Sequence, residues 1–380
     1  MDQITLGALE IEEIDQALYK KIKDGWDKVA KPLDGMGSFE ELLSRIGAIQ
    51  GRLLPEVERS RVIVCCADNG IVEEGVSQSG QEITAICAGN IAGGRSSVAI
   101  MARQAGVDVL CVDVGINTDE KISGVRDEKI RKGTRNFRKE PAMTAAEVEK
   151  AFDVGEKLVL ESKEAGYAIL GIGEMGIGNT TTSSAVTAAL LGLSSVTVTG
   201  RGAGLDDAGL SRKKAIIREA LFQYGYQTEL GEAQEMAEKI GVELGEKREP
   251  AYSQRELALD VLETMGGYDL ACMAGICLGG AKHHVPIVLD GFISLAAALV
   301  ACWIEPKVKA YLIPSHSGKE PAVKAIEKEL GLQPVIYAKM ALGEGTGAVM
   351  MLQLLKTANA VYENSVSFEG AGIGQYERFQ

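Results

Sequence analysis

The sequence lacks an excess of positive charge and a long apolar run, and each absence excludes a class of protein. Its 40 basic and 53 acidic side chains give a formal net charge of −13, which repels polyanions and leaves no basic stripe for nucleic acid. The longest apolar stretch, GFISLAAALVACWI, is shorter than the roughly 20 residues that cross a bilayer. We therefore expect neither a nucleic-acid partner nor a membrane partner.

The sequence also lacks the cysteine patterns of metal sites and disulfide frameworks. Its 7 cysteines are odd in number, lie mostly in apolar runs and show no paired C-x-x-C spacing with nearby histidines. The neighbouring His283 and His284 have no acidic or cysteine set at metal spacing beside them. With an acidic N-terminus where a signal peptide would be basic and then apolar, this predicts a soluble, cytoplasmic protein with reduced core thiols and no metal.

Aromatic residues (5%) and prolines (9) are few, whereas glycines number 45, a composition typical of many tight strand-to-helix turns. Short β-branched runs each end in Gly or Asp and precede a helical pattern; they occupy residues 61–70, 107–115, 167–176, 195–202, 285–291 and 309–318. This alternation predicts an α/β fold with a doubly wound, mostly parallel, Rossmann-like sheet flanked by helices. A ligand would lie outside the carboxyl ends of the strands.

The two ends of the chain have a helical pattern instead. Residues 8–56 show apolar positions at helical spacing, with Ser38 as the expected N-cap and Glu41 as its capping-box partner. The C-terminal segment predicts a loop that leads into a long amphipathic helix. We therefore expect a large α/β domain with the active-site cleft at 57–340, and a small helical domain formed by 1–56 plus 341–380. The charged stretch at 229–250 predicts a solvated helix face with a loop.

A glycine loop, GIGEMGIGNTTTSSAV, follows the strand predicted near residue 170 and contains the G-x-G-x-x-G pattern. A dinucleotide site would need an acidic residue after the next strand, where Arg201 stands. A packing turn without a ligand is an equally good interpretation of the glycines alone. A third is a pyridinium ribonucleotide, because Glu174 suits a cation and the helix start at Asn179 suits a phosphate.

A second glycine loop, ALGEGTGAVM, places Glu344 between two glycines just before a helix. A surface carboxylate at a helix N-terminus is the simplest interpretation. Alternatively, the glycines allow a ligand close to the backbone, and Glu344 accepts a proton from it. Lys213 begins another helix and would pair with phosphate, and Ser315 and His316 end a strand where they could line the cleft.

Several motifs in the same order together resemble those of the nicotinate-nucleotide:dimethylbenzimidazole phosphoribosyltransferase family. They include CADNGIVEEGVS, GIGEMGIGNTTTSSA, VTGRGAGLDDAGLSRK, GGYDLACMAGICLGGA, PIVLDGFISLAAAL, YLIPSHSGKEPA and LGEGTGAVM, and they cover nearly the whole chain. The resemblance implies transfer of the phosphoribosyl group of nicotinate mononucleotide to a lower-ligand base of cobamides, without a cofactor. It also implies that no dinucleotide is bound.

The resemblance assigns roles to individual residues. Glu344 matches the family's catalytic base, and Glu174 matches its other active-site glutamate, for which we expect an electrostatic or auxiliary role. Ribose and phosphate would be held by Gly176, Asn179, Thr180, Gly202, Lys213 and Ser315. The acceptor base would lie against Ser79, Ile86, Cys87 and Leu342.

The acceptor region departs from the family pattern. Many members have proline at the Gly80 position and a glutamine where this chain has Ile86 or Cys87. Loss of the amide removes a hydrogen bond worth about 1 kcal/mol to a polar base and makes the pocket more apolar. The acceptor, whether a benzimidazole, a purine or a phenolic compound, therefore stays open.

The family resemblance implies a homodimer with the cleft near the subunit interface. Some relatives that activate phenols work as a pair of paralogous subunits, and this chain could be one such half. A non-catalytic nucleotide-binding relative and a dinucleotide-dependent oxidoreductase are the remaining alternatives. Retention of both Glu174 and Glu344 argues against a mere binder, because such a protein needs no isolated proton acceptor.

Overall fold

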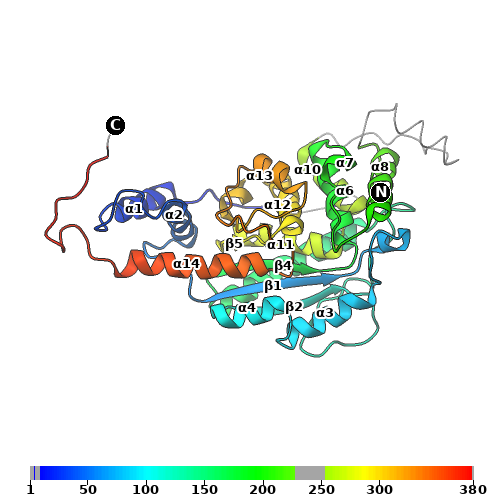
Figure 1. Ribbon diagram of the computed structural model, residues 1–380, viewed down its shortest axis with the longest axis horizontal. Coiled ribbons are helices and arrows are strands. Elements are labelled where there is room, and N and C mark those ends of the chain that lie inside the picture. The colour runs from blue at the N-terminus through cyan, green and yellow to red at the C-terminus, as the bar shows by residue number, and fades with distance from the viewer. Residues whose placement is uncertain (1–3, 5–8, 227–252, 379–380) are drawn as a thin grey trace.

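The computed structural model describes residues 4, 9–226 and 253–378 (Figure 1). The charged stretch at 229–250, for which a solvated helix was predicted, lies outside these residues. Within the described part of the chain, no helix is both long and apolar enough to cross a membrane.

The centre of the molecule is one sheet of six strands in the order β3-β2-β1-β4-β5-β6. Every neighbouring pair is parallel, which confirms the predicted doubly wound sheet. The order reverses between β1 and β4, the point where such sheets open a crevice for ligands. The strands are β1 (Ser60–Ala67), β2 (Asp108–Gly115), β3 (Arg126–Asp127), β4 (Ile169–Met175), β5 (Ile287–Val288) and β6 (Leu312–Ile313).

Helices cover both faces of the sheet because both sides of β1 are apolar. Ile63 and Cys65 point into one hydrophobic core, and Val62 and Val64, one residue away in each case, point into the other. The first core is formed with α5 (Ala145–Glu164), α6 (Asn179–Leu191), α8 (Asp207–Gln223), α10 (Gln254–Met265), α11 (Tyr268–Lys282), α12 (Phe292–Ile304), η2 (Pro306–Tyr311) and α13 (Val323–Leu330). The second core is formed with α1 (Gln16–Trp26), α2 (Ser38–Gln50), α3 (Glu82–Ala92), α4 (Ser97–Ala105) and α14 (Thr346–Asn364). A short 3₁₀ helix, η1 (Gly70–Glu74), follows β1.

One of the predicted strands is wrong. Residues 195–202 form the short helix α7 (Ser195–Val198) and a turn, and they lie outside the sheet. The hydroxyl of Ser194 accepts a hydrogen bond from the backbone N–H of Thr197, which caps this single turn. The β-branched run suggested a strand, but over so few residues a helix and a strand have the same apolar pattern. Here the cap and the packing of Val198 between α6 and α8 decide for the helix.

The predicted cap of α2 is also wrong. The helix begins at Ser38 itself, Gly37 is the N-cap residue, and no side chain forms a cap hydrogen bond. The Glu40 carboxylate accepts a hydrogen bond from the N–H of Met36, in the loop before the helix, at 3.1 Å. Because Gly37 has φ +55°, the chain enters the helix through a conformation that a Ser-capped start does not use.

The C-terminal segment forms the long helix that the sequence predicts. In Figure 1, α14 runs along the sheet, and α1 and α2 lie beside its C-terminal half at one end of the molecule. There the Tyr362 ring packs on Trp26 with 4.6 Å between the ring centroids, and its hydroxyl donates to the Ile22 carbonyl at 3.4 Å. The division into domains 57–340 and 1–56 plus 341–380 stays a prediction.

Candidate active site

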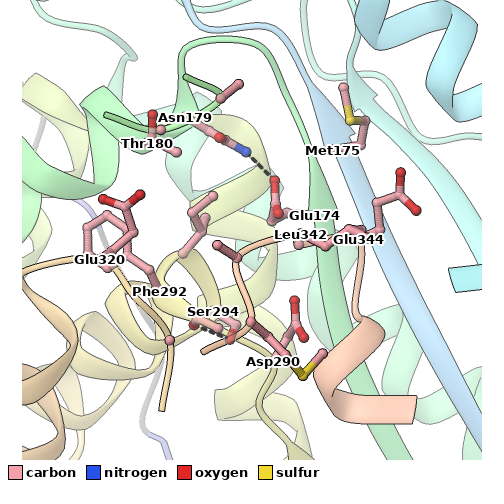
Figure 2. Close-up of a pocket in the computed structure, with 18 of the residues that line it drawn as sticks. Glu174, Met175, Asn179, Thr180, Asp290, Phe292, Ser294, Glu320, Leu342 and Glu344 are labelled. Atoms are coloured by element: carbon pink, nitrogen blue, oxygen red, sulfur yellow. Dashed lines mark hydrogen bonds between the residues drawn. The ribbon is translucent and has the colours of Figure 1, made fainter. Parts of the chain in front are cut away.

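A cleft opens at the carboxyl ends of β4, β5 and β6 and has a cavity volume of about 260 Å³. It is closed on one side by the N-terminus of α6 and on the other by the loop before α14 (Figure 2). Its lining includes Glu174, Met175, Gly176, Asn179, Thr180, Gly202, Asp290, Phe292, Ser294, His316, Glu320, Leu342 and Glu344. The cleft is therefore where the fold class predicts a ligand.

Glu174 lies near the end of β4 and is only 9% exposed. Its carboxylate accepts a hydrogen bond of 2.5 Å from the Asn179 side chain and is drawn beside it in Figure 2. The pKa of Glu174 is raised to about 8, chiefly by burial and also by the nearby carboxylates of Asp269 and Asp290, against the opposing effect of the Asn179 hydrogen bond. In the free protein this carboxyl group therefore holds a proton near neutral pH.

Glu344 lies in the loop before α14, where three consecutive residues have positive φ. Gly343, Glu344 and Gly345 have φ of +84°, +60° and +92°. The loop passes so close to β4 that a Cβ on Gly173 would lie 2.6 Å from the carbonyl group of Glu344, so only glycine fits there. The half-buried Glu344 carboxylate accepts a hydrogen bond of 3.3 Å from the N–H of Val98 at the start of α4.

Of the predicted phosphate residues, Gly176, Asn179, Thr180 and Gly202 line the cleft, whereas Lys213 and Ser315 lie behind its lining. Lys213 was predicted to begin a helix, but α8 begins at Asp207 and Lys213 lies well inside it. Lys213 is fully buried, and its ammonium group donates to the Thr180 hydroxyl at 2.8 Å. Gly202, with φ +53°, lies against the same hydroxyl, since a Cβ there would be 2.7 Å from it. Burial lowers the pKa of Lys213 to about 8, while the Glu320 carboxylate acts in the opposite direction. A cation that has lost its hydration in this way is prepared to pair with an incoming anion.

Ser315 lies behind the cleft. It is 2% exposed, its hydroxyl donates to the carbonyl of Asp290 at 3.0 Å, and it is 3.1 Å from Nδ1 of His316. It is outside the cavity lining, whereas His316 is part of it. The structure thus places Ser315 where it supports the loop after β5.

Of the four predicted acceptor residues, only Leu342 belongs to the lining of the cleft. Leu342 lines the cavity and is 53% exposed. Ser79, Ile86 and Cys87 do not line it, and Ile86 on α3 is 57% exposed. Cys87 does lie near the second glutamate, because burial and then the Glu344 charge raise the pKa of its thiol.

Two acidic residues of the site were missed in the sequence, and a third, Asp290, was covered only by the observation that the run at 285–291 ends in Asp and Gly. Asp269 on α11 shares the Asn179 amide with Glu174, and burial raises its pKa to about 6. Asp290 follows β5, and Glu320 lies in the loop after β6. The strand end was a usable signal for Asp290, but a charged residue in a loop gave none for Glu320.

The geometry argues against a dinucleotide site. The segment that should have been the next strand, with a ribose-binding residue at its end, is the helix α7. The glycines of the first loop serve close packing instead: a Cβ on Gly176 would lie 2.2 Å from the carbonyl oxygen of Ala67.

Comparisons with known proteins agree with this picture. The sequence model of a family described as "Phosphoribosyltransferase" matches residues 11–373. A curated protein from Clostridium acetobutylicum, named nicotinate-nucleotide–dimethylbenzimidazole phosphoribosyltransferase, is 39% identical over 97% of this chain and 97% of its own length. The chain belongs to this phosphoribosyltransferase family.

Other relatives in the family have similar lengths and the same fold. A protein of the same name from Clostridium perfringens is 38% identical over 96% of this chain and 93% of its own length. The crystal structure of CobT from Thermus thermophilus matches with a TM-score of 0.82 and 34% identity, over 95% of this chain and 100% of that one. The chain is thus a pentosyl-transferring enzyme of the phosphoribosyltransferase class. The match to the family covers nearly the whole chain, including both glycine loops.

Proposed function

We propose that the protein transfers the 5-phosphoribosyl group of nicotinate mononucleotide to an aromatic base, giving the α-riboside phosphate and nicotinate for cobamide synthesis. The observation that carries the proposal is the arrangement of the cleft. Glu174 and Glu344 both line the cleft, and the buried Lys213 lies directly behind Thr180 and Gly202, which line the same cleft. A donor with a phosphate at one end and a pyridinium at the other fits this separation of charges.

The donor's phosphate would occupy the part of the cleft in front of Lys213. It would lie against the N-terminus of α6, where Gly178 offers no capping side chain and the helix dipole favours an anion. The pyridinium ring would lie toward Glu174 and Glu344. An adjacent positive charge lowers the pKa of a carboxyl group, so donor binding would drive Glu174 to release its proton and face the ribosyl centre as an anion.

The bond changes then need only one proton acceptor. The bond between the ribose C1′ and the nicotinate nitrogen breaks, and its electron pair leaves with the ring, which neutralises the pyridinium. A nitrogen of the acceptor base forms the new bond to C1′, and Glu344 takes the proton from that ring. The enzyme's other contribution is to hold the two rings and the sugar in line.

The same proposal includes assembly and location. Several large apolar side chains are exposed on the surface: Leu342 in the cleft lining at 53%, and Ile86 and Tyr337 outside it at 57% and 68%. These would be covered in a homodimer, or in a heteromer with a paralogue. The described cysteines are all free thiols, most of them buried, which suits the reducing cytoplasm. Light scattering of the purified protein measures the assembly directly.

The test is an acceptor panel. The purified protein is incubated with nicotinate mononucleotide and separately with dimethylbenzimidazole, benzimidazole, adenine, p-cresol and phenol, and nicotinate and riboside phosphates are followed by chromatography and mass. We expect nicotinate release with at least one acceptor and none without. If no acceptor supports release, the single chain does not have the proposed activity. Recovery of activity on mixing with a paralogous subunit would then identify a paired enzyme.

A further inference from the structure

Asp290 is a buried carboxylate on the loop between β5 and α12, and it is only 4% exposed. A buried carboxylate is costly unless donors surround it. The His316 ring, on the loop after β6, faces it as well. Its position at the floor of the cleft, beneath Glu174, is visible in Figure 2.

The donors to Asp290 come from the first turn of α14. The backbone N–H of Gly345 donates to Oδ2 at 3.1 Å, and that of Gly347 donates to Oδ1 at 2.7 Å. The N-cap residue of α14 is Gly345, which has no side chain to satisfy these groups. Asp290 therefore caps the helix from a distant part of the chain, and its charge also interacts favourably with the helix dipole.

The residue just before this cap is Glu344. A non-glycine residue at φ +60° costs on the order of 1 kcal/mol and persists only where its surroundings enforce it. The surroundings here are Gly173 on β4, the hydroxyl of Thr346, which donates to the Gly343 carbonyl at 2.9 Å, and the Asp290 carboxylate. Among these, Asp290 binds the N–H of the peptide that joins Glu344 to Gly345.

We propose that Asp290 is a positioning residue for Glu344: by holding the N–H groups of Gly345 and Gly347, it fixes the backbone from which the Glu344 carboxylate reaches the acceptor base. This inference rests on the proposed function of Glu344 as proton acceptor. Both Asp290 oxygens are engaged with backbone donors, so the residue acts through the loop and leaves the proton transfer to Glu344.

The test is a double-mutant cycle with Asp290→Asn and Glu344→Gln, measured as steady-state turnover of nicotinate mononucleotide with the acceptor found in the panel. The amide keeps the size of Asp290 but presents N–H groups to one of the backbone donors. A misplacement of about 1 Å costs roughly 100-fold in rate, so we expect kcat to fall by about that factor. We expect the KM for the donor to change by less than about 3-fold, because the residues proposed to hold the phosphate are untouched.

The double variant decides whether Asp290 acts through Glu344. When Glu344 is already glutamine, Asp290→Asn should lower turnover by no more than about 2-fold further, since there is no base left to position. If the turnover losses of the two single variants multiply in the double variant, Asp290 acts independently of Glu344, and the inference is overturned. Wild-type kcat in Asp290→Asn would overturn it as well. Wild-type turnover in Glu344→Gln alone would instead remove the proposed role of Glu344, and this inference with it.

Controls separate positioning from stability. Thr144 caps α5 through a capping box far along the chain from the cleft, so Thr144→Ala should lower the thermal midpoint and leave kcat unchanged. If Asp290→Asn does not fold, Asp290→Ser keeps one oxygen acceptor for the α14 turn and should fold with an intermediate kcat. A folded Asp290→Ser with wild-type kcat would contradict the inference.

Discussion

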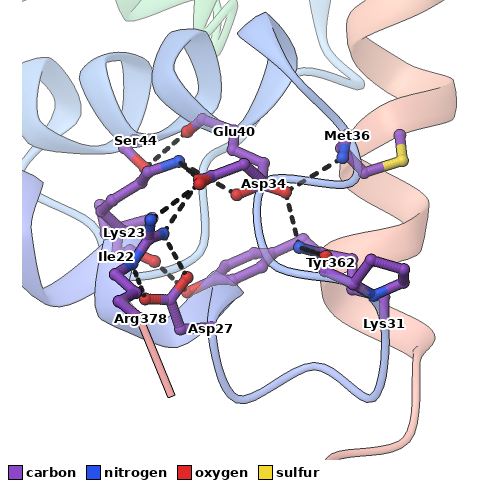
Figure 3. Close-up of polar contacts among 11 residues, drawn as sticks. Ile22, Lys23, Asp27, Lys31, Asp34, Met36, Glu40, Ser44, Tyr362 and Arg378 are labelled. Atoms are coloured by element: carbon purple, nitrogen blue, oxygen red, sulfur yellow. Dashed lines mark hydrogen bonds and ion pairs between the residues drawn. The ribbon is translucent and has the colours of Figure 1, made fainter. Parts of the chain in front are cut away.

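Two buried glutamates in this protein have opposite acid–base behaviour. Glu40, in the cluster of α1, α2 and the C-terminal tail, is fully buried, yet its pKa is lowered (Figure 3). Burial alone would raise it, but hydrogen bonds from Lys31, the N–H of Met36 and Lys23 outweigh that effect. Glu174 in the cleft has an amide as its side-chain donor, and burial raises its pKa to about 8. Whether a buried glutamate is ionised therefore depends more on its hydrogen-bonding partners than on how deeply it is buried.

The whole terminal cluster follows the same rule. Asp27, Asp34 and Glu40 offer oxygens within 4.8 Å of one another, a spacing that could suit a metal ion. Each of them is already paired with a lysine or arginine: Arg378 binds Asp27 and Asp34, and Lys23 binds Asp34 and Glu40. In Figure 3 these contacts join the tail to the loop between α1 and α2. Such carboxylates, paired with cations, hold structure together, whereas Glu174 and Glu344 in the cleft accept hydrogen bonds from uncharged donors and are available for proton chemistry.

The largest expected effect comes from removing the proton acceptor. Glu344→Gln should lower kcat by roughly 10²- to 10⁴-fold, because general base catalysis contributes about that much. Binding of nicotinate mononucleotide, measured by calorimetry, should persist. Glu369→Gln, an exposed carboxylate in the C-terminal tail, is the matched control and should behave as wild type. Near-normal turnover of the Glu344 variant would remove this residue from the mechanism.

The second prediction concerns the cation of the cleft. Lys213→Met keeps an unbranched side chain but removes the charge that would face the donor's phosphate, and a charge-assisted hydrogen bond contributes about 1.5–3 kcal/mol. We expect donor affinity to fall roughly 10- to 100-fold in a direct binding titration. Lys214→Met is the neighbouring control, since Lys214 is only partly buried, whereas the ammonium group of Lys213 is the one that binds Thr180 in the cavity lining. Equal losses in both variants would point to general electrostatics instead of a phosphate contact.

In the terminal cluster, Glu40→Gln should destabilise the protein. The change leaves Lys23 and Lys31 without their shared carboxylate, and we expect the free energy of unfolding at pH 7 to fall by roughly 1–3 kcal/mol, since the partly exposed lysines are screened by solvent. The folded pKa of Glu40 is lowered, so its contribution is present above the unfolded value and is lost as the pH falls through the folded one. Denaturation at pH 7 and pH 3 should show the difference shrink, and a constant difference would refute the pairing.

The smallest expected effect is a gain in stability, in contrast to the loss expected for Glu40→Gln. The folded pKa of Glu174 is about 8, well above the ordinary value of 4.5, so the wild-type protein loses stability as the pH rises from about 5 to 8. Glu174→Gln cannot ionise and should be more stable than wild type at pH 8, on the order of 1–2 kcal/mol, while turnover falls. Urea denaturation at pH 5 and pH 8 measures this. A variant that is less stable than wild type at pH 8 would contradict the raised pKa.

Local patterns in the sequence predicted most of the fold but not all of it. Runs such as 61–70 and 167–176 became β1 and β4 because a buried parallel strand needs continuous apolar residues between turn signals. The run at 195–202 is also β-branched, but its first residues form a helix, since Ser194 caps them and they pack on α6 and α8 outside the sheet. Short segments are decided by their neighbours, which no local pattern contains.

The features of the candidate site likewise divide into those that the sequence predicts and those that only the folded structure determines. The sequence by itself determined the residue types that chemistry requires: Glu174 and Glu344 stand in glycine loops at strand or helix ends, and Lys213 belongs to a helical pattern, although it lies inside α8 and not at its start. Only the tertiary structure decided which charges have partners. Asp290 meets the start of α14 and Asp269 meets Asn179 across long stretches of chain, and these contacts, together with burial, set protonation and position. Burial and pairing are properties of packing between distant segments, so they appear only once the chain is folded.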